Sequence, residues 1–493
     1  MARVCDRRMT TDQGSERAGT DAAATSREHA TSHDILAERA GVGRTRRAAV
    51  PRSAHADWQP AQDRPDPVDL LEEQAATRVP ELVPIRYGRM LISPFTFYRG
   101  AAYLMASDLA GLPRTGLEAQ LCGDAHLSNF GAFAAPDRRL VFSISDFDET
   151  LPGPFEWDVK RLVTSFAVAG RDRGFSTRQR RAINVAVSRS YREAIREMAT
   201  MRTMDLWYAR LQVDAIRTEL VSKVSASQRK RFERNVAKAR SKDSLKALKK
   251  LVRRVDGRPR LVADPPLIVP VEDLVPDLEA REVHSAMEAL VRSYRRTLQG
   301  DHRRLLDRYR YVDAARKVVG VGSVGTRAWI LLLMGRDDDD PLFLQAKEAQ
   351  ASVLEPFVGR SSYAHHGQRV VEGQRLMQAA SDIMLGWVSA GGTDGVNRDF
   401  FVRQLWDGKG SAVLEVLEPS AMTAYAGLCG WTLARAHARS GDASGIAGYL
   451  GGGTVFDEAM SSFAEAYADQ NEADHAALQR AVDSGRVKAE IGL

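Results

Sequence analysis

The spacing of apolar and polar positions divides the chain into long helical stretches. Apolar residues at helical spacing predict helices in six stretches: 66–84, Phe95–Leu109, 155–171, most of 177–260, 280–310 and about 420–486. Gly111 and Pro113 are stop signals for the second of these helices. The third carries Asp158 near its start and buries Leu162, Phe166 and Val168. The pattern therefore predicts a protein that is mainly helical.

Strand signals gather in two other regions. Between residues 117 and 150, short apolar runs alternate with Gly, Asn, Asp and Pro, which is typical of small strands and turns. Residues 318–334 begin with glycines and β-branched residues and continue as an apolar strand, and LFLQAKEA predicts a second strand that ends on Lys347. A helix over Gln368–Asp382 and strands over Ile383–Ser389 and Asp399–Leu405 follow. The second region is thus predicted to be an antiparallel β unit.

These elements imply five segments. Residues 1–40 lack apolar periodicity and are expected to be disordered, and 41–80 form a basic, Pro-containing lead-in with a short helix. Residues 81–310 form a large helical part, 311–410 the β part, and 411–493 helices that complete the large part. Pro265–Pro276 is predicted to be a connector without regular structure.

The amino-acid composition is that of an ordinary soluble protein. The 493 residues exceed the size of a single hydrophobic core, so two or three lobes with a cleft between them are expected. No apolar run approaches the length of a membrane span, and no secretory signal is present. Three scattered cysteines offer neither a disulfide framework nor a metal motif. We therefore expect a cytoplasmic protein with no membrane partner.

Charge is concentrated in one segment. Residues 229–254 carry twelve Lys or Arg against Glu233 and Asp243, a net charge of +10, so a total of +6 leaves the remaining chain at −4. A solvated helical face is the simplest interpretation. Binding of an anionic partner, including nucleic acid, is possible but not favoured.

The stretch LCGDAHLSNFG, residues 121–131, offers the first candidate chemistry. Asp124 and Asn129 have the D-x-x-x-x-N spacing with which kinases place a base on the acceptor hydroxyl and a side-chain oxygen on Mg²⁺. Asp146 and Asp148 follow at a strand end and are predicted metal ligands, Asp148 for a second metal or as a structural acceptor. His126 is a candidate to position the loop or contact phosphate, with a structural role as the alternative.

A second group of residues supplies the parts that such a site needs. Gly320, Gly322 and Gly325 form G-x-G-x-x-G, and with Ser323 they are predicted to cover nucleotide phosphates, because a strand rather than a helix follows them. Lys347 stands where a kinase lysine grips the α- and β-phosphates. Glu372 is the predicted carboxylate that holds it, with Glu355 as second choice. Adenine is expected against a hinge at 405–407, which includes Leu405 and Trp406.

Several motifs resemble those of aminoglycoside- and choline-type phosphotransferases. Their catalytic loop, metal-binding Asp and next helix correspond to GDAHLSN, DFD and the following helix with an Asp. VGVGSVGTR with Lys347 resembles their nucleotide loop and strand lysine. From residue 41 on, the chain resembles the bacterial domain-of-unknown-function 2252 family. The motifs that carry this resemblance are PRSAHADW, PIRYGRM, FYRGAA, LCGDAHLSNFG, DFDETLPGPFEWDVKRL, RVVEGQR and RQLWDGKGS. The resemblance implies an α+β, protein-kinase-like two-lobe fold with a mainly helical large lobe and a small antiparallel β-sheet lobe.

The order of the motifs departs from that of ordinary kinases. There the glycine loop and lysine precede the catalytic loop, whereas here Asp124 precedes Gly320. A circular permutation explains this order: the usual chain is cut just before the catalytic loop and its ends are joined. LARAHA, residues 433–438, resembles the helix that ordinarily leads into the catalytic loop. Permutation therefore requires Asp124, Asp146 and Lys347 to meet in one cleft.

The sequence thus predicts an ATP- and Mg²⁺-dependent phosphotransferase with an unknown small-molecule or protein acceptor. Four alternatives stay open. One is a non-catalytic kinase-like ATP-binding or scaffold protein. Another is nucleotidyl transfer on the same fold. DFDET also fits the D-x-D-x-T motif of haloacid-dehalogenase-like phosphatases, with Asp146 as nucleophile and Asp148 as acid or base. GDAH resembles part of the binuclear metallophosphoesterase motif.

Overall fold

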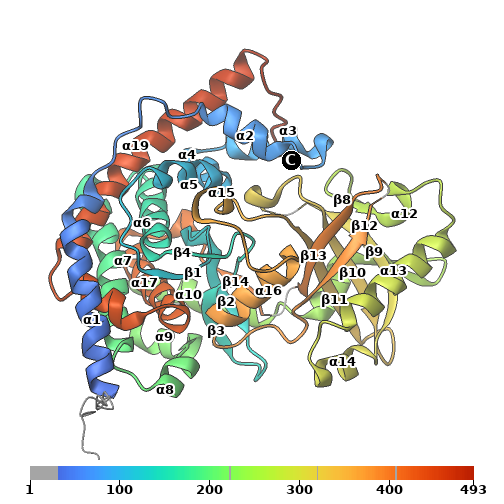
Figure 1. Ribbon diagram of the computed structural model, residues 1–493. Helices are drawn as coiled ribbons and strands as arrows, with labels where there is room; N and C mark the ends of the chain where they lie inside the picture. Colours follow the sequence, from blue (N-terminus) through green and yellow to red (C-terminus); the bar gives the residue numbers. More distant parts are fainter. Residues whose placement is uncertain (1–31, 221–223, 319, 393, 406–407, 493) are drawn as a thin grey trace, which may run out of the picture.

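A computed structural model describes residues 32–220, 224–318, 320–392, 394–405 and 408–492. Helices and antiparallel sheets make up an α+β fold, and Figure 1 shows a helical part beside a part built on a six-stranded sheet. The predicted hinge residues 406 and 407 and the first 31 residues lie outside these ranges. Helix α1 (Ser32–Ala49) begins within the segment expected to be disordered.

The helical part is built around α6 (Phe155–Asp172), which is buried along nearly its whole length. Three long helices surround it: α7 (Thr177–Met198), α17 (Pro419–Ser440) and α19 (Val455–Asp483). The short helices α8 (Thr203–Tyr208) and α18 (Ala443–Leu450) complete this layer. The buried residues of α6 include apolar side chains and also charged ones, such as Asp158 and Arg161. The largest apolar cluster contains Val159, Leu162 and Phe166 of α6.

Four short helices near the start of the chain pack above this core, between α19 and the sheet (Figure 1): α2 (Pro67–Ala75), α3 (Val83–Met90), α4 (Pro94–Gly100) and α5 (Ala102–Ala110). Asp66 caps α2 by accepting from the N–H groups of Val68 and Asp69, as its Asp-Pro start predicts. The single helix predicted over Phe95–Leu109 is in fact two, which meet at Ala101.

The second part is a sheet of six antiparallel strands in the order β12-β13-β11-β10-β9-β8. In chain order the strands are β8 (Ile268–Pro270), β9 (Arg310–Lys317), β10 (Ala328–Met334), β11 (Pro341–Ala349), β12 (Gly386–Gly391) and β13 (Asn397–Gln404). Helix α16 (His366–Met377) connects β11 to β12, preceded by the single turn α15 (Glu355–Val358). The predicted β unit is therefore confirmed and is larger than expected.

Helices α12 (Val271–Leu274), α13 (Ala280–Arg295) and α14 (Gly300–Leu306) lie on the far side of this sheet (Figure 1). The predicted connector 265–276 contains both β8 and α12. Ile268 of β8 pairs with Lys317 of β9 at the edge of the sheet. The connector is thus part of the sheet.

Small strands join the two parts. β1 (Glu118–Leu121) pairs with β4 (Leu151–Pro154), and a second sheet has the order β14-β2-β3-β5. Its strands are β2 (Phe130–Ala134), β3 (Leu140–Ile144), β5 (Leu211–Gln212) and β14 (Gly410–Ser411). The loops after β1 and β3 carry the acidic motifs.

Residues 177–260, predicted to be helical throughout, also contain strands. After α8 and β5 come α9 (Val213–Leu220), α10 (Ala226–Arg240) and α11 (Ser244–Leu251), followed by the hairpin β6 (Val252–Val255) and β7 (Arg258–Leu261). Asp256 and Gly257 form the hairpin turn with positive φ, which is the Asp-Gly chemistry of a tight β-turn.

Candidate functional site

A cleft of about 440 Å³ lies where the helical part, the small strands and the six-stranded sheet meet. Its lining includes most of the residues selected from the sequence: Asp124, His126, Asn129, Asp146, Asp148, Gly320, Gly322, Ser323, Lys347 and Leu405. Gly325 and Glu372 do not line it, and Trp406 lies outside the described residues. The geometric requirement that Asp124, Asp146 and Lys347 share one cleft is therefore met.

Asp124 lies in the loop after β1, where a guanidinium holds it. Arg161 Nη2 lies 2.8 Å from its Oδ1, while the guanidinium stacks 3.8 Å from the ring of Tyr98. Burial raises the pKa of Asp124, and Arg161 acts against this rise. His126 Nε2 lies 3.6 Å from the other carboxylate oxygen. The carboxylate is thus fixed in position, with a pKa above the ordinary value for aspartate.

His126 is buried, and its Nδ1 has no hydrogen-bond partner among the described residues. Burial, with the charges of Arg99 and Arg161, holds its pKa well below the usual range. The imidazole is therefore neutral and offers an unused ring nitrogen at the cleft.

Asn129 and Asp146 present oxygen atoms at the floor of the cleft. Asn129 Nδ2 donates to the carbonyl of Asp124 at 2.9 Å, which fixes the amide and leaves its Oδ1 as an acceptor. Asp146 follows β3. Burial alone would raise its pKa, but Lys347, Arg403 and Lys409 together hold the pKa of this carboxyl below its ordinary value. Asp146 is therefore an ionised carboxylate surrounded by cations.

Lys347 and Asp148 form an ion pair across the cleft. Lys347 lies within β11, with only 3% of its surface exposed, although the sequence predicted it at a strand end. Asp148 also accepts from Ser323 Oγ at 3.3 Å, and its Oδ1 has no partner in the described ranges. Burial and the neighbouring Asp146 raise the pKa of Asp148 while Lys347 lowers it. One carboxylate thus joins the strand lysine to the glycine segment.

Glu372 does not hold Lys347. It lies on α16 as predicted, but its carboxylate pairs with Arg375 at 3.1 Å, one turn along the same helix. The second choice, Glu355, is the first residue of α15, and its carboxylate accepts from the backbone N–H of Ser352. Gln374 and Gln378, from α16 and its end, line the cleft instead. The predicted role of Glu372 is therefore taken by Asp148.

The glycine segment is a tight turn rather than an open hairpin. Residues Val321–Ser323 form a 3₁₀ turn between β9 and β10. A Cβ on Gly322 would lie 3.1 Å from the carbonyl of Arg99, and Gly325 has φ +89° against the side chain of Arg78. Glycine is needed at both places, at one for close approach and at the other for the left-handed backbone. Gly325 thus shapes the turn without lining the cleft.

A buried chain of side chains supports the loop that carries Asp124. Asp158 of α6 accepts from the backbone N–H groups of Cys122 and Gly123 at 2.8 and 3.1 Å. His437 Nε2 lies 3.3 Å from the same carboxylate, and its Nδ1 lies 2.8 Å from the hydroxyl of Tyr191. Two distant helices, α7 and α17, therefore fix the loop through one aspartate.

Sequence reasoning missed three cations that line the cleft: Lys317, Arg403 and Lys409. Arg99 Nε is buried without a partner among the described residues. Arg403 donates to the carbonyl of Ser145 at 3.1 Å and to Gln345 at 3.3 Å. A basic residue carries no signature of burial in a single sequence.

The residues present suit a magnesium ion. Magnesium prefers oxygen ligands and commonly takes one or two protein carboxylates, with phosphates and water completing its octahedron. Asn129, Asp146 and the unpaired oxygen of Asp148 supply such a set, whereas no cluster of three or more His, Cys, Asp or Glu that could hold a metal occurs in the described ranges. The site thus fits a metal that arrives with a phosphate ligand.

None of the helices within the described ranges is long and apolar enough to cross a membrane.

Comparison with known proteins finds one family. No curated protein and no solved structure matches the chain. A family model described as an uncharacterized protein conserved in bacteria (DUF2252) matches residues 78–481, which include all residues that line the cleft except Gln74. The chain therefore belongs to the DUF2252 family of uncharacterized bacterial proteins.

Proposed function

We propose that this protein is an ATP- and Mg²⁺-dependent phosphotransferase that acts on a hydroxyl acceptor. The observation that carries the proposal is the ion pair between Lys347 and Asp148, residues 199 positions apart. It brings a strand lysine, a glycine turn and the acidic motif after β3 to one cleft that Asp124 also lines. These are the parts that phosphoryl transfer requires, because its catalysis consists of positioning and charge stabilisation.

The glycine turn and the basic side chains of the cleft would bind the phosphates. The backbone of Gly320–Ser323 lines the cleft opposite Asp146, and Lys347 is held extended by Asp148. Arg99 and Arg403 reach the same space from α4 and β13. A nucleoside triphosphate would replace the contact that Lys347 now makes with Asp148 and those that Arg403 makes with Ser145 and Gln345, and its base would lie toward Leu405 and Val318.

Asn129, Asp146 and Asp148 would hold the metal ion. A bound ion would neutralise negative charge on the phosphates. Asp148 would then exchange its contact with Lys347 for the metal, which frees the ammonium group for phosphate. The three side chains need no backbone movement for this, since each already lines the cleft.

Asp124 is the proposed base. Its Oδ1 is engaged by Arg161, so Oδ2 is the oxygen that accepts the proton of the acceptor hydroxyl. Arg161 orients the carboxylate and acts against the rise in its pKa that burial causes. General-base catalysis of this kind contributes about 10²- to 10⁴-fold to a rate.

The arrangement supports a circularly permuted kinase-like fold. α17, which contains LARAHA, ends at Ser440, and Ser440 Oγ accepts from the backbone N–H of Gln120 on β1 at 3.1 Å. The helix expected to lead into the catalytic loop thus ends beside that loop, although 320 positions separate the two residues. The order β9, glycine turn, β10, β11 with Lys347, and α16 is also that of an ordinary kinase nucleotide lobe.

The proposal is tested first by binding. Purified protein with Mg²⁺ is expected to show an ATP-dependent rise in melting temperature that Lys347→Ala removes. Lys488→Ala, a change of the same type near the C-terminus and outside the cleft, serves as control and should keep the rise. Absence of a shift in the wild type, or an unchanged shift in Lys347→Ala, contradicts the site.

The acceptor is sought by incubating a bacterial metabolite extract with ATP and protein, followed by mass spectrometry. We expect a compound that gains a phosphate with wild type and not with Asp124→Asn. A gain of AMP would assign nucleotidyl transfer to the same residues. If Asp124→Asn produces the adduct at the wild-type rate, Asp124 is not the base.

A further inference from the structure

The basic segment 229–254 lies beside the cleft and carries an ordered stripe of charge. Lys or Arg occupies every fourth position in it: Lys230, Arg234, Lys238, Lys242, Lys246 and Lys250. Residues four apart on a helix share a face, and like charges at that spacing destabilise the helix. Five of the six are exposed, and Lys242, between α10 and α11, is half-buried. The chain thus maintains a face that its own helices disfavour.

Carboxylates neutralise little of this face. Leaving Lys250 aside, two of the cations between 229 and 254 pair with a carboxylate in the part of the chain that the structure describes, Arg240 with Asp214 and Arg254 with Asp338. The charge of Lys238 and Lys246 is therefore available to an anion from solution.

The stripe continues into the cleft. The backbone N–H of Gly408 donates to the carbonyl of Lys242 at 2.9 Å, and Gly410 lies against Ala239 of α10. Lys409, between those glycines, and Lys317 both line the cleft. Burial followed by the charges of Lys238, Lys246 and Lys250 lowers the pKa of Lys242. Stripe and cleft cations therefore form one positive field.

Packing fixes this arrangement. Ala247 and Leu251 of α11 are buried against Phe343 of β11 and Leu405. The basic helices are thus held against the same strand that carries Lys347, and the stripe keeps its position relative to the cleft.

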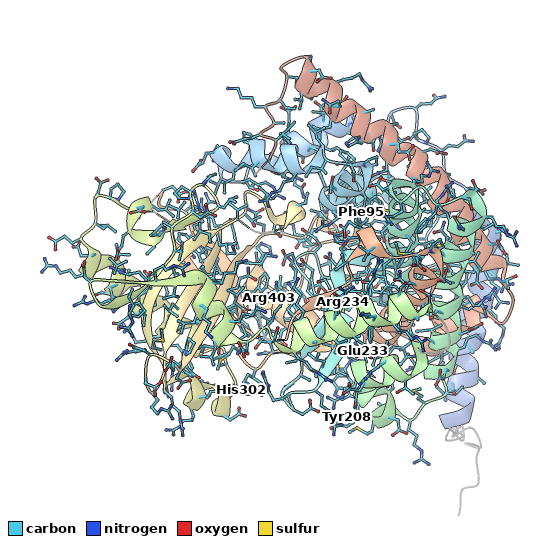
Figure 2. All side chains as sticks on the ribbon, turned by 180° about the vertical axis from the view of Figure 1, so that it is seen from behind. Phe95, Tyr208, Glu233, Arg234, His302 and Arg403 are labelled. Atoms are coloured by element: carbon cyan, nitrogen blue, oxygen red, sulfur yellow. The ribbon has the colours of Figure 1, made fainter. Side chains whose placement is uncertain are left out.

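Exposed aromatic side chains stand at the end of α8. Tyr208 and Trp207 at the end of α8 are 66% and 41% exposed, and Arg439 stacks 3.8 Å over the Trp207 ring. Ion pairs of α9 with α10, such as Arg217 with Glu233, tie this corner to the stripe. Figure 2 shows Tyr208 and Arg234 on the same side of the molecule, with α10 between the two parts.

We propose that the stripe on α10 and α11, with Tyr208, binds single-stranded nucleic acid at the mouth of the cleft. Cations in a row contact successive phosphates, and an exposed aromatic ring stacks on a base whatever its identity, which is the combination found in single-strand binding surfaces. Continuity with the cations of the cleft favours a phosphate polymer over an acidic protein. The proposal does not depend on phosphotransfer.

The test uses the full chain without ATP and a fluorescent RNA strand of about 20 nucleotides of mixed sequence, with anisotropy as readout. The wild type is expected to bind with an affinity that falls steeply with salt. The triple change Lys238→Gln, Lys242→Gln and Lys246→Gln should weaken binding at least about tenfold and reduce the salt slope by about 2, since each phosphate contact contributes about 0.7. Tyr208→Ala should weaken binding about fivefold or more with an unchanged slope.

A matched triple, Arg178→Gln, Arg281→Gln and Arg292→Gln, removes the same charge from exposed positions elsewhere and should bind like the wild type. Equal loss in both triples, or no binding by the wild type at low salt, overturns the proposal. Tight binding to vesicles rich in phosphatidylserine, lost in the first triple while RNA binding is absent, would assign the stripe to a membrane surface and also overturn it.

Discussion

At the residue scale, the site depends on carboxylates whose charge is set by burial and by neighbouring cations. Asp124 and Asp146 line one cleft, yet burial raises the pKa of the first whereas cations lower that of the second. Pairs of acidic groups driven apart in this way divide the roles of base and metal ligand. The following two predictions concern single side chains.

The acid limb of the proposed transfer activity should lie above the ordinary aspartate value of 3.8, because the ionised form of Asp124 is the proposed base and burial raises its pKa. Asp124→Asn should lower the turnover by about 10²- to 10⁴-fold and leave the ATP-dependent thermal shift intact. Turnover measured against pH checks the first statement. An acid limb that persists in the residual activity of Asp124→Asn would assign it to another group.

Glu149 should make stability depend on pH. Burial raises its pKa from 4.5 to about 7, so its contribution to stability is complete below pH 4.5 and is lost as pH rises through 7. In Glu149→Gln this loss is absent, so the variant should gain up to about 3 kcal/mol relative to wild type between pH 4.5 and 8. Its amide oxygen can still accept from the N–H of Val353.

Urea unfolding at both pH values measures this gain. Glu118→Gln, at an exposed position, is the matched control and should follow the wild type at both pH values. A gain of equal size at pH 4.5 and pH 8 would mean that Glu149 does not titrate in this range.

The limits of prediction from sequence are clearest on α16. The motif RVVEGQR placed this helix correctly beside Lys347, but it selected Glu372, whereas Gln374 faces the cleft. Residues two positions apart on a helix, such as 372 and 374, differ by about 200° around its axis. A small error in the predicted orientation of the helix therefore changes which side chain faces the site. The spacing of Asp124 and Asn129 needed no such phase, because both lie in one short loop.

At the element scale, the glycine turn is held by apolar anchors. Val321 is buried with Val68, Leu71 and Phe97 of the helices near the start of the chain, and Val324 with Val79 and its neighbours. The backbone of Val79 also donates to the carbonyl of Gly325 at 2.8 Å. A phosphate-binding turn with two buried valines moves less than an exposed hairpin, so it is already shaped for its ligand.

Val321→Ala should therefore affect ligand binding more than its stability cost implies. Val68→Ala removes the same methyl groups from the same apolar cluster but leaves the residues of the turn itself unchanged. Both changes should destabilise by about 1–3 kcal/mol, and only Val321→Ala should weaken ATP binding. Calorimetry at a temperature where both variants are folded compares them. Equal ATP affinities would show that the anchor does not shape the turn.

The sequence indicated these elements unevenly. Gly325 and the apolar strand after it correctly predicted a turn between strands. The anchors came from residues 67–100, whose helices could be predicted from periodicity, whereas their contact with a turn some 220 positions away leaves no local pattern. Likewise β6 and β7 are short and basic, so the helical signal around them concealed the hairpin.

At the scale of the whole molecule, helices α2 to α4 and the last described residues of the chain pack together at the glycine turn. Leu478 and Val487, at the end of α19 and beyond it, belong to the same apolar cluster as Val321. The backbone N–H of Glu490 donates to the carbonyl of Pro84 at 2.8 Å, and the C-terminus lies beside α3 (Figure 1). The last residues thus buttress the helices that anchor the turn.

Deletion of residues 485–493 should loosen this corner alone. Amide hydrogen exchange is expected to rise in 83–90 and in the turn after β9, and to stay unchanged in the strands β10 and β11. Mass spectrometry of peptides from both regions checks this. Uniformly faster exchange would mean that the tail stabilises the whole molecule, and unchanged exchange that it contributes nothing to the turn.

From the sequence, the meeting of distant motifs could be predicted only as a requirement that a permuted fold would have to satisfy. A permutation would require Asp124, Asp146 and Lys347 to share one cleft, and all three line it. The cations that complete the cleft, such as Arg99 and Lys409, come from segments with no motif in common. Their meeting is a property of the folded chain, because long-range contacts leave no trace in local spacing.

The ion pair between Lys347 and Asp148 also has a consequence in time. A ribosome adds about 5–20 residues per second, so Lys347 is synthesised about 10–40 s after Asp148, which lies 199 positions earlier. During this interval Asp146 and Asp148 lack the cations of β11 and β13, and unpaired carboxylates resist burial. The nascent helical part must therefore keep these side chains hydrated, and the cleft can close only after β11 has left the ribosome.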